Sequence, residues 1–160
     1  MKDVHFSSES NEWETPEKLF DQLNKLYGPF DLDPCATNKN FKCDKYYTKE
    51  DDGLTKTWFG KVFMNPPYGN QISKWIEKAY NESLRGIEIV CLIPARTDTS
   101  YFHKFCLRYG TIIFLKGRIK FKNRNFKINS APFPSMIVIF PKIEIKENPK
   151  FYQLTLKDLS

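Results

Sequence analysis

The feature that most constrains this chain is a repeated order of amphipathic helical pattern, glycine and short apolar run. In the segment TPEKLFDQLNKLYG, apolar residues recur at helical spacing, Thr15 can cap the helix, Pro16 suits its first turn and Gly28 can end it. The same order recurs over residues 70–86 and 100–110. Each glycine is followed directly by a strand candidate: PFDLDP, IEIVCLIP or TIIFL. Helices that alternate with strands in this way are typical of an α/β fold.

Two further apolar runs, KVFMN and SMIVIF, complete the set of predicted strands. Their nearly continuous apolar character indicates strands that are buried on both faces, as in a parallel sheet covered by helices. Right-handed crossovers would make this a mostly parallel, doubly wound sheet with helices on both faces. Because 160 residues that are 41% hydrophobic suffice for one core, we expect a single domain over residues 1–160, with 1–11 and 145–160 as candidate peripheral segments.

Polar and proline-containing segments follow three of the predicted strands. They read DLDPCATNKN, NPPYG and PARTDT. In open α/β sheets, ligands bind at the carboxyl ends of the strands. We therefore expect all three segments to line one cleft.

The segment Asn65-Pro66-Pro67-Tyr68 is unusual at the end of a buried strand. Its two prolines remove two backbone donors and fix two φ angles, and the first proline confines Asn65 to extended conformations. The result is a rigid turn with free carbonyl groups and one side-chain amide. Taken alone, such a segment can also be a structural Pro-Pro turn with a core tyrosine.

This NPPY segment resembles the (D/N/S)PP(Y/F/W) motif of amino-methyltransferases that use S-adenosylmethionine. The resemblance extends through WETPEKLFDQL, FDLDPCATNKN, DDGLTKTWFGKVFMNPPYG, LIPARTDTSYFHKF, GRIKF and FPSMIVIF. In this order the segments are similar to the small phage-type Dam-like DNA N6-adenine methyltransferases, over most of residues 11–141. The resemblance implies a Rossmann-like methyltransferase sheet, S-adenosyl-L-methionine as cofactor and DNA as partner.

The resemblance also implies a catalytic role for each residue of NPPY. The N6 nitrogen of adenine is a poor nucleophile, because its lone pair is delocalised into the ring. If the Asn65 side-chain oxygen and the Pro66 carbonyl each accept one N6–H, the nitrogen is drawn toward a tetrahedral shape and its lone pair can point at the sulfonium methyl. Pro66 and Pro67 would hold these acceptors in place. Tyr68 would offer a ring on which a flipped base can stack.

Further residues are implied as cofactor ligands by the same resemblance. Asp33 and Pro34 end the first strand at the position of the family's first motif, although DPCATNKN lacks the G-x-G of most methyltransferases. Asp52 resembles the position whose carboxylate accepts from the adenine amino group of the cofactor, and is otherwise an ordinary turn residue. Thr15 and Pro16 resemble a segment that packs against the methionine end. We identify no residue for the ribose hydroxyls.

Positive charge is concentrated in the second half of the chain. Between Asp98 and Glu144 there are nine Lys and Arg residues and no acid, so a chain of net charge +6 has a net charge of −3 elsewhere. Within this interval KGRIKFKNRNFK alternates charged and apolar residues, which predicts a strand or hairpin with one basic face. We expect contact with phosphates, the alternative being a solvated face. The candidate nucleic-acid ligands are Arg96, Lys116, Arg118, Lys120, Lys122, Arg124 and Lys127.

Other classes of function are disfavoured. The four cysteines include no C-x-x-C pair and the two histidines are far apart, so we expect no metal site. No apolar run approaches the roughly 20 residues of a membrane span, so we expect a cytoplasmic protein with reduced thiols. Two alternatives stay open: glutamine N5 methylation of a protein, and a catalytically silent nucleic-acid-binding module of the same fold. The sequence distinguishes neither duplex from single-stranded DNA or RNA, nor the oligomeric state, nor the recognition sequence, which would depend on loops such as 37–50 and 117–133.

Overall fold

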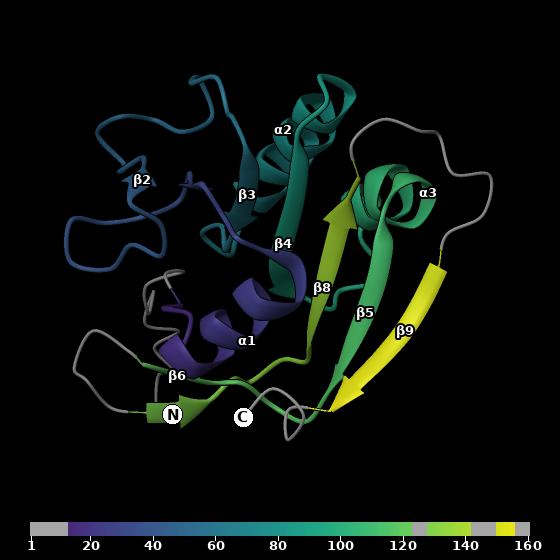
Figure 1. The fold of residues 1–160 in the computed structure, drawn as a ribbon. Helices are drawn as coiled ribbons and strands as arrows, with labels where there is room; N and C mark the ends of the chain where they lie inside the picture. Colours follow the sequence, from purple (N-terminus) through teal and green to yellow (C-terminus); the bar gives the residue numbers. More distant parts are fainter. Residues whose placement is uncertain (1–12, 123–127, 142–149, 156–160) are drawn as a thin grey trace, which may run out of the picture.

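The computed structural model describes residues 13–122, 128–141 and 150–155. Its centre is a seven-stranded sheet with the strand order β2-β1-β3-β4-β8-β5-β9 (Figure 1). A separate two-stranded hairpin is formed by β6 and β7. The strands are β1 (Leu32–Asp33), β2 (Lys45–Tyr46), β3 (Lys61–Met64), β4 (Glu88–Pro94), β5 (Thr111–Lys116), β6 (Lys120–Lys122), β7 (Ile128–Ser130), β8 (Ser135–Phe140) and β9 (Lys150–Thr155).

Four of the six strand pairs in the sheet are parallel. β1 pairs in parallel with β2 and β3, β3 with β4, and β5 with β9. β8 lies between β4 and β5 and is antiparallel to both. β4 and β5 therefore run in the same direction and end at the same edge of the sheet as β1 and β3. The prediction of a mostly parallel sheet is confirmed. The antiparallel direction of β8 was not part of that prediction.

Helices cover both faces of this sheet, as predicted (Figure 1). On one face α1 packs Phe20 against Phe63 of β3, with ring centroids 5.1 Å apart. On the other face α2 packs together with η1, and Tyr80 meets Phe105 at 5.2 Å. The helical elements are α1 (Glu17–Tyr27), α2 (Ile72–Leu84), η1 (Phe102–Cys106) and α3 (Leu107–Tyr109).

The residues of each central strand alternate between two cores. In β4, Ile89, Cys91 and Ile93 belong to the core on the α2 face. Val90 and Leu92 belong to the core on the α1 face. All five side chains are fully buried, which explains why the strand reads as a continuous apolar run.

Glycines follow the helices where the sequence predicts them. Gly28 follows α1 and donates its N–H to the carbonyl of Asn24 at 2.8 Å. Gly86 follows the C-cap residue of α2, Arg85, and has a φ of +89°, a conformation that favours glycine.

The third helix differs from the regular helix predicted over residues 100–110. Phe102–Cys106 form a π-helical turn, and a single α-helical turn follows before Gly110. Phe102, Phe105 and Cys106, which follow the i, i+3, i+4 spacing expected of a helix, are all buried. The apolar pattern of the sequence therefore predicts a helix and does not reveal its irregular turn.

Neither of the two edge strands, β2 and β9, was predicted, and β2 lies within the loop expected over residues 37–50. β9 belongs to residues 145–160, the segment expected to be peripheral, and it pairs with β5 from Thr111↔Lys150 to Lys116↔Thr155.

Within the described residues no helix has the length and apolar character needed to cross a membrane.

Candidate functional site

A cavity of about 760 Å³ opens at the carboxyl ends of β1 and β3. Its volume lies in the range of small-molecule sites in proteins. Its walls come from four parts of the chain, within residues 13–15, 33–42, 48–54 and 63–75. This is the edge of an α/β sheet at which ligands bind.

The cavity brings together most of the residues that the resemblance implies. Pro16, Tyr68 and Arg96 do not line it. The expectation that PARTDT shares one cleft with the other two segments is therefore wrong. The backbone N–H of Ala95 donates to the carbonyl of Pro134 at 2.8 Å, which directs the chain after β4 toward the start of β8. The predicted residues that do line the cavity are Thr15, Asp33, Pro34, Asp52, Asn65, Pro66 and Pro67.

The side chain of Asn65 is held by the segment that precedes α1. Its amide nitrogen donates to the backbone carbonyl of Trp13 at 2.5 Å and to Thr15 Oγ1 at 2.9 Å. Because a carbonyl oxygen can only accept, the amide nitrogen and not Oδ1 must face Trp13. Asn65 Oδ1 is buried and has no hydrogen-bond partner in the described part of the chain. A buried acceptor without a partner is costly, and a donor on a ligand would satisfy it.

The predicted capping role of Thr15 is wrong. The N-cap residue of α1 is Pro16, which has no side chain able to make a cap hydrogen bond. Thr15 is 4% exposed, and its hydroxyl oxygen accepts from Asn65 instead. The helix-start pattern in the sequence thus predicts the correct start of α1. The hydroxyl group of Thr15, however, belongs to the candidate site and does not cap the helix.

Asp33 places a buried carboxylate at the end of β1. It is 4% exposed, and it accepts the N–H of Cys35 at 3.1 Å and the N–H of Lys42 at 3.0 Å. Burial raises the pKa of Asp33 to about 6, although these two hydrogen bonds and the charge of Lys42 act in the opposite direction. At neutral pH the group is therefore largely ionised but poorly hydrated, a state that favours binding a cation or a hydrogen-bond donor.

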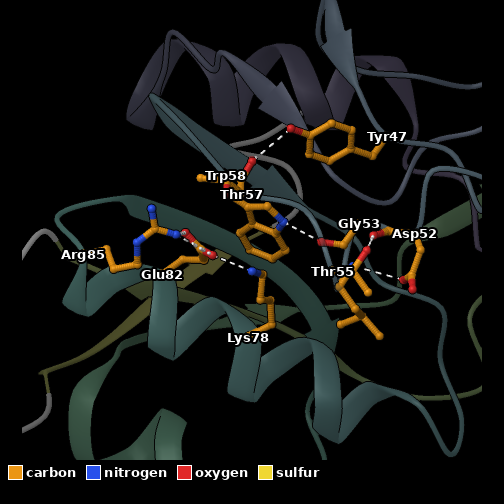
Figure 2. A network of polar contacts seen from close by, with 10 residues as sticks. Tyr47, Asp52, Gly53, Thr55, Thr57, Trp58, Lys78, Glu82 and Arg85 are labelled. Carbon is orange, nitrogen blue, oxygen red and sulfur yellow. Dashed lines mark hydrogen bonds and ion pairs between the residues drawn. The ribbon is translucent and has the colours of Figure 1, made fainter.

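The loop between β2 and β3 supplies the wall that carries Asp52 (Figure 2). Asp52 has a φ of +56°, and its Oδ1 accepts the N–H of Leu54 at 3.3 Å. The indole N–H of Trp58 donates to the carbonyl of Gly53 at 2.8 Å (Figure 2). The ring of Trp58 stacks on that of Trp75 of α2, with centroids 6.3 Å apart. Asp52 is thus a turn residue, as the alternative interpretation holds, and it also lines the cavity.

Gly53 is a site residue that the sequence interpretation missed. A Cβ at this position would lie 2.3 Å from the carbonyl oxygen of Pro34 and 3.1 Å from the ring of Trp75. Only glycine therefore lets this loop approach the end of β1 so closely. The Asp-Gly pair within EDDGL was the available signal, and it also fits an ordinary turn.

Tyr68 is buried beneath other aromatic residues. It is 5% exposed, its ring lies 5.4 Å from Phe133 and 6.5 Å from Phe121, and its hydroxyl is 3.4 Å from the carbonyl of Leu92. The ring of Trp13 contacts the same two phenylalanines, with centroids 5.4 Å from Phe133 and 5.5 Å from Phe121. In this conformation Tyr68 offers no open stacking face, so its stacking role stays a prediction that requires Phe133 or Phe121 to move.

The basic segment forms a hairpin with the predicted alternation. β6 pairs antiparallel with β7, Ile119 and Phe121 are buried, and Arg118 and Lys120 are exposed. Lys116 is exposed at the end of β5, on the edge of the sheet where the cavity opens. Through Phe121 and Trp13 the hairpin adjoins the wall of the cavity.

The other cations of the interval lie elsewhere or outside the described residues. Arg124, Lys127 and Lys142 belong to the second group, as does the side chain of Lys122. Lys104 and Arg108 lie on η1 and α3, on the sheet face opposite the hairpin. The described cations between Asp98 and Glu144 therefore do not share one surface, and of these the cations of the hairpin adjoin the wall of the cavity. Three lysines from other parts of the chain, Lys42, Lys49 and Lys74, line the cavity itself.

Two other kinds of site can be assessed from the side chains. Among the described residues no group of three or more His, Cys, Asp or Glu side chains is arranged to hold a metal ion. Cys35 lines the cavity, but burial raises the pKa of its thiol well above the usual range. Because the thiolate is the nucleophilic form of cysteine, Cys35 is poorly suited to attack a substrate.

One family model and two phage proteins similar to this chain carry the same description. The family model for DNA N-6-adenine-methyltransferase (Dam) matches residues 4–157. A DNA N-6-adenine-methyltransferase of Escherichia phage T1 is 33% identical over 107 residues, which cover 65% of this chain and 44% of the relative. Another, from Haemophilus phage HP1, is 28% identical over 138 residues, which cover 83% of this chain and 80% of the relative. The chain thus spans less than half the length of the phage T1 relative.

Among solved structures, one described as a class I S-adenosylmethionine-dependent methyltransferase from Listeria monocytogenes has the same fold. The match has a TM-score of 0.57 at 15% identity and covers 94% of this chain and 68% of that one. At this identity the likeness shows the fold alone, and it confirms the Rossmann-like sheet. Because the family model spans nearly all of the chain, this protein belongs to the DNA N-6-adenine-methyltransferase (Dam) family.

Proposed function

We propose that this protein transfers the methyl group of S-adenosyl-L-methionine to the N6 amino group of adenine in DNA. The observation that carries the proposal is the buried Oδ1 of Asn65, an acceptor without a partner among the described residues, at a cavity beside Pro66 and Pro67. Family membership supports the same reaction. We also propose a cytoplasmic location. We further propose a single methyltransferase domain over residues 1–160, because the described strands between residues 32 and 155 form one sheet and one hairpin.

Two hydrogen-bond acceptors, the side-chain oxygen of Asn65 and the backbone carbonyl of Pro66, suit an exocyclic amino group. Asn65 Oδ1 and the carbonyl of Pro66 would accept one N6–H each, which draws the nitrogen toward a tetrahedral shape and frees its lone pair. Because two hydrogen bonds already fix the Asn65 amide, the orientation of this acceptor is set before the reaction. The two prolines restrict the backbone that carries the second acceptor.

Other residues that line the cavity suit the cofactor. When bound, S-adenosyl-L-methionine supplies an electrophilic methyl group on a positively charged sulfur. The poorly hydrated carboxylate of Asp33 would stabilise the positively charged part of this molecule or accept from its hydroxyl groups. Asp52 would accept from the adenine amino group, and Pro34 with Gly53 would form the adjoining wall. Pro16, which does not line the cavity, would act only through the start of α1.

DNA would approach from the hairpin side of the cavity. Lys116, Arg118 and Lys120 are exposed there and would contact phosphates. Arg96 is exposed outside the cavity and would contact the backbone near the target nucleotide. Tyr68 would stack on a flipped adenine once the aromatic residues that cover it have moved.

The salt dependence of DNA binding tests this placement. Each phosphate contact contributes a slope of about −0.9 to log K against log salt on duplex DNA. Arg118→Gln with Lys120→Gln should therefore flatten the slope by about two units and leave cofactor affinity unchanged. The matched control is Lys104→Gln with Arg108→Gln, two cations on the other face of the sheet, which should leave the slope unchanged. Equal slopes for both double variants would mean that the hairpin is merely solvated.

The reaction itself is tested by transfer of a labelled methyl group to unmethylated DNA, followed by nucleoside analysis. The expected product is N6-methyladenine. Label in N4- or C5-methylcytosine would contradict the proposed acceptor. Label in a protein glutamine would instead support the N5 alternative, and cofactor binding without any transfer would support a silent nucleic-acid-binding module.

A further inference from the structure

We propose that Thr15 is a positioning residue for methyl transfer: together with the backbone carbonyl of Trp13, it holds the side-chain amide of Asn65 in the one orientation that leaves Oδ1 available to the target amino group. The proposal rests on the proposed function. It assigns Thr15 a task different from packing against the cofactor, the task that resemblance implies.

The contacts that carry the proposal join segments that are far apart in the sequence. Both N–H groups of one amide are used, one toward Trp13 at 2.5 Å and one toward Thr15 Oγ1 at 2.9 Å. The two acceptors are 52 and 50 residues away from Asn65 in sequence. An amide that donates on one side in this way must present its oxygen on the other.

The orientation matters because the amide group has two nearly equivalent positions. The terminal torsion of an asparagine is broad and roughly two-fold, so a half-turn exchanges the oxygen and the nitrogen. In the wrong orientation Asn65 would present N–H donors to an amino group that is itself a donor. The carbonyl of Trp13 and Thr15 Oγ1 both accept from the amide nitrogen, so they disfavour the orientation in which the amide oxygen faces them. Removal of one acceptor weakens this preference.

Thr15 is itself held firmly. It is 4% exposed, and α1 begins two residues later and is fixed to the sheet by the buried side chains of Leu19, Phe20 and Leu23. Trp13 is fixed by ring contacts with Phe121 and Phe133. The segment before α1 is therefore a rigid support for the side-chain amide of Asn65.

The test compares Thr15→Val, which keeps the shape and removes the hydroxyl, with Thr15→Ser, which keeps the hydroxyl. At saturating cofactor and DNA, Thr15→Val should lower the single-turnover rate about tenfold, because one of two orienting hydrogen bonds is lost. Thr15→Ser should recover most of that rate, and the dissociation constant of S-adenosylmethionine should change less than twofold in both variants. Ser83→Ala is the matched control, since it removes a hydroxyl of similar burial that bonds only within α2 and should leave the rate unchanged.

A second measurement does not depend on activity. The side-chain amide protons of Asn65 are assigned in NMR spectra by their loss in Asn65→Ala, and in Thr15→Val they should shift and exchange faster with water. Full rate in Thr15→Val, equal losses in the Val and Ser variants, a loss of cofactor affinity alone, or an unchanged amide signal would each overturn the proposal. If the unmodified protein transfers no methyl group, the proposed function fails, while the amide signal still reports whether Thr15 orients Asn65.

Discussion

Asn65→Ala will lower the single-turnover rate of methyl transfer to DNA by at least tenfold, while the affinity for S-adenosylmethionine changes little. The substitution removes an acceptor whose interaction strengthens as N6 gains positive charge, so the loss appears in the rate and not in ground-state binding. Removal of a comparable preorganised hydrogen-bonding group in other enzymes costs about 10²–10³ in kcat. The measurement is labelled-methyl transfer at saturating cofactor, with calorimetry for the cofactor and Asn81→Ala, exposed on α2, as control.

Asn65→Asp should fail as well, although aspartate is an accepted first residue of the motif that NPPY resembles. Here the position must donate to the carbonyl of Trp13 at 2.5 Å, and a carboxylate has no proton to donate. Two oxygens would face each other in a buried site, which should lower both the rate and the free energy of unfolding, the latter by about 1–3 kcal/mol. Wild-type activity in either variant would show that the Asn65 amide does not hold the adenine amino group.

Asp33→Ala will weaken binding of S-adenosylmethionine by about ten- to a hundredfold, the equivalent of about 1.5–3 kcal/mol for a lost charged acceptor. Asp33 is buried at the end of β1 and lines the cavity, so few water molecules compete with the ligand for its carboxylate. Asp98→Ala is the control, because Asp98 also follows a strand but is exposed and does not line the cavity. Calorimetry that finds equal affinity in Asp33→Ala and the unmodified protein would remove Asp33 from the cofactor site.

The raised pKa of Asp33 predicts that cofactor affinity and protein stability change in opposite directions with pH. Because the pKa is about 6, the carboxylate is ionised at pH 7.5 and mostly protonated at pH 5, so cofactor affinity should fall as the pH drops through 6. Asp33→Asn should abolish this dependence. In the protein without ligand, the folded state holds this proton more tightly than the unfolded chain, so the contribution of Asp33 to stability should rise as the pH falls from about 6 toward 4. Affinity that is equally pH-dependent in Asp33→Asn would assign the titration to another group.

Local patterns in the sequence determined the helices, most strands and the place of the site. Apolar periodicity marked α1 and α2, continuous apolar runs marked the long central strands, and Gly28 and Gly86 marked helix ends. These signals act between residues close in sequence. The rule that ligands bind at the carboxyl ends of strands then placed Asp33 and Asn65 at one cavity. The alternation of Arg118, Ile119, Lys120 and Phe121 likewise predicted a hairpin with one basic face.

The tertiary structure alone decided what surrounds these residues. The segment PARTDT does not line the cavity, and the N–H of Ala95 donates instead to the carbonyl of Pro134 just before β8. Tyr68 is covered by Phe121 of β6 and by Phe133 between β7 and β8, both more than 50 residues away in sequence. Thr15 has the sequence signature of a helix cap, yet its hydroxyl accepts from Asn65, 50 residues distant. Contacts of this kind depend on which elements pack side by side, and a pattern that repeats every two or every three to four residues carries no record of that choice.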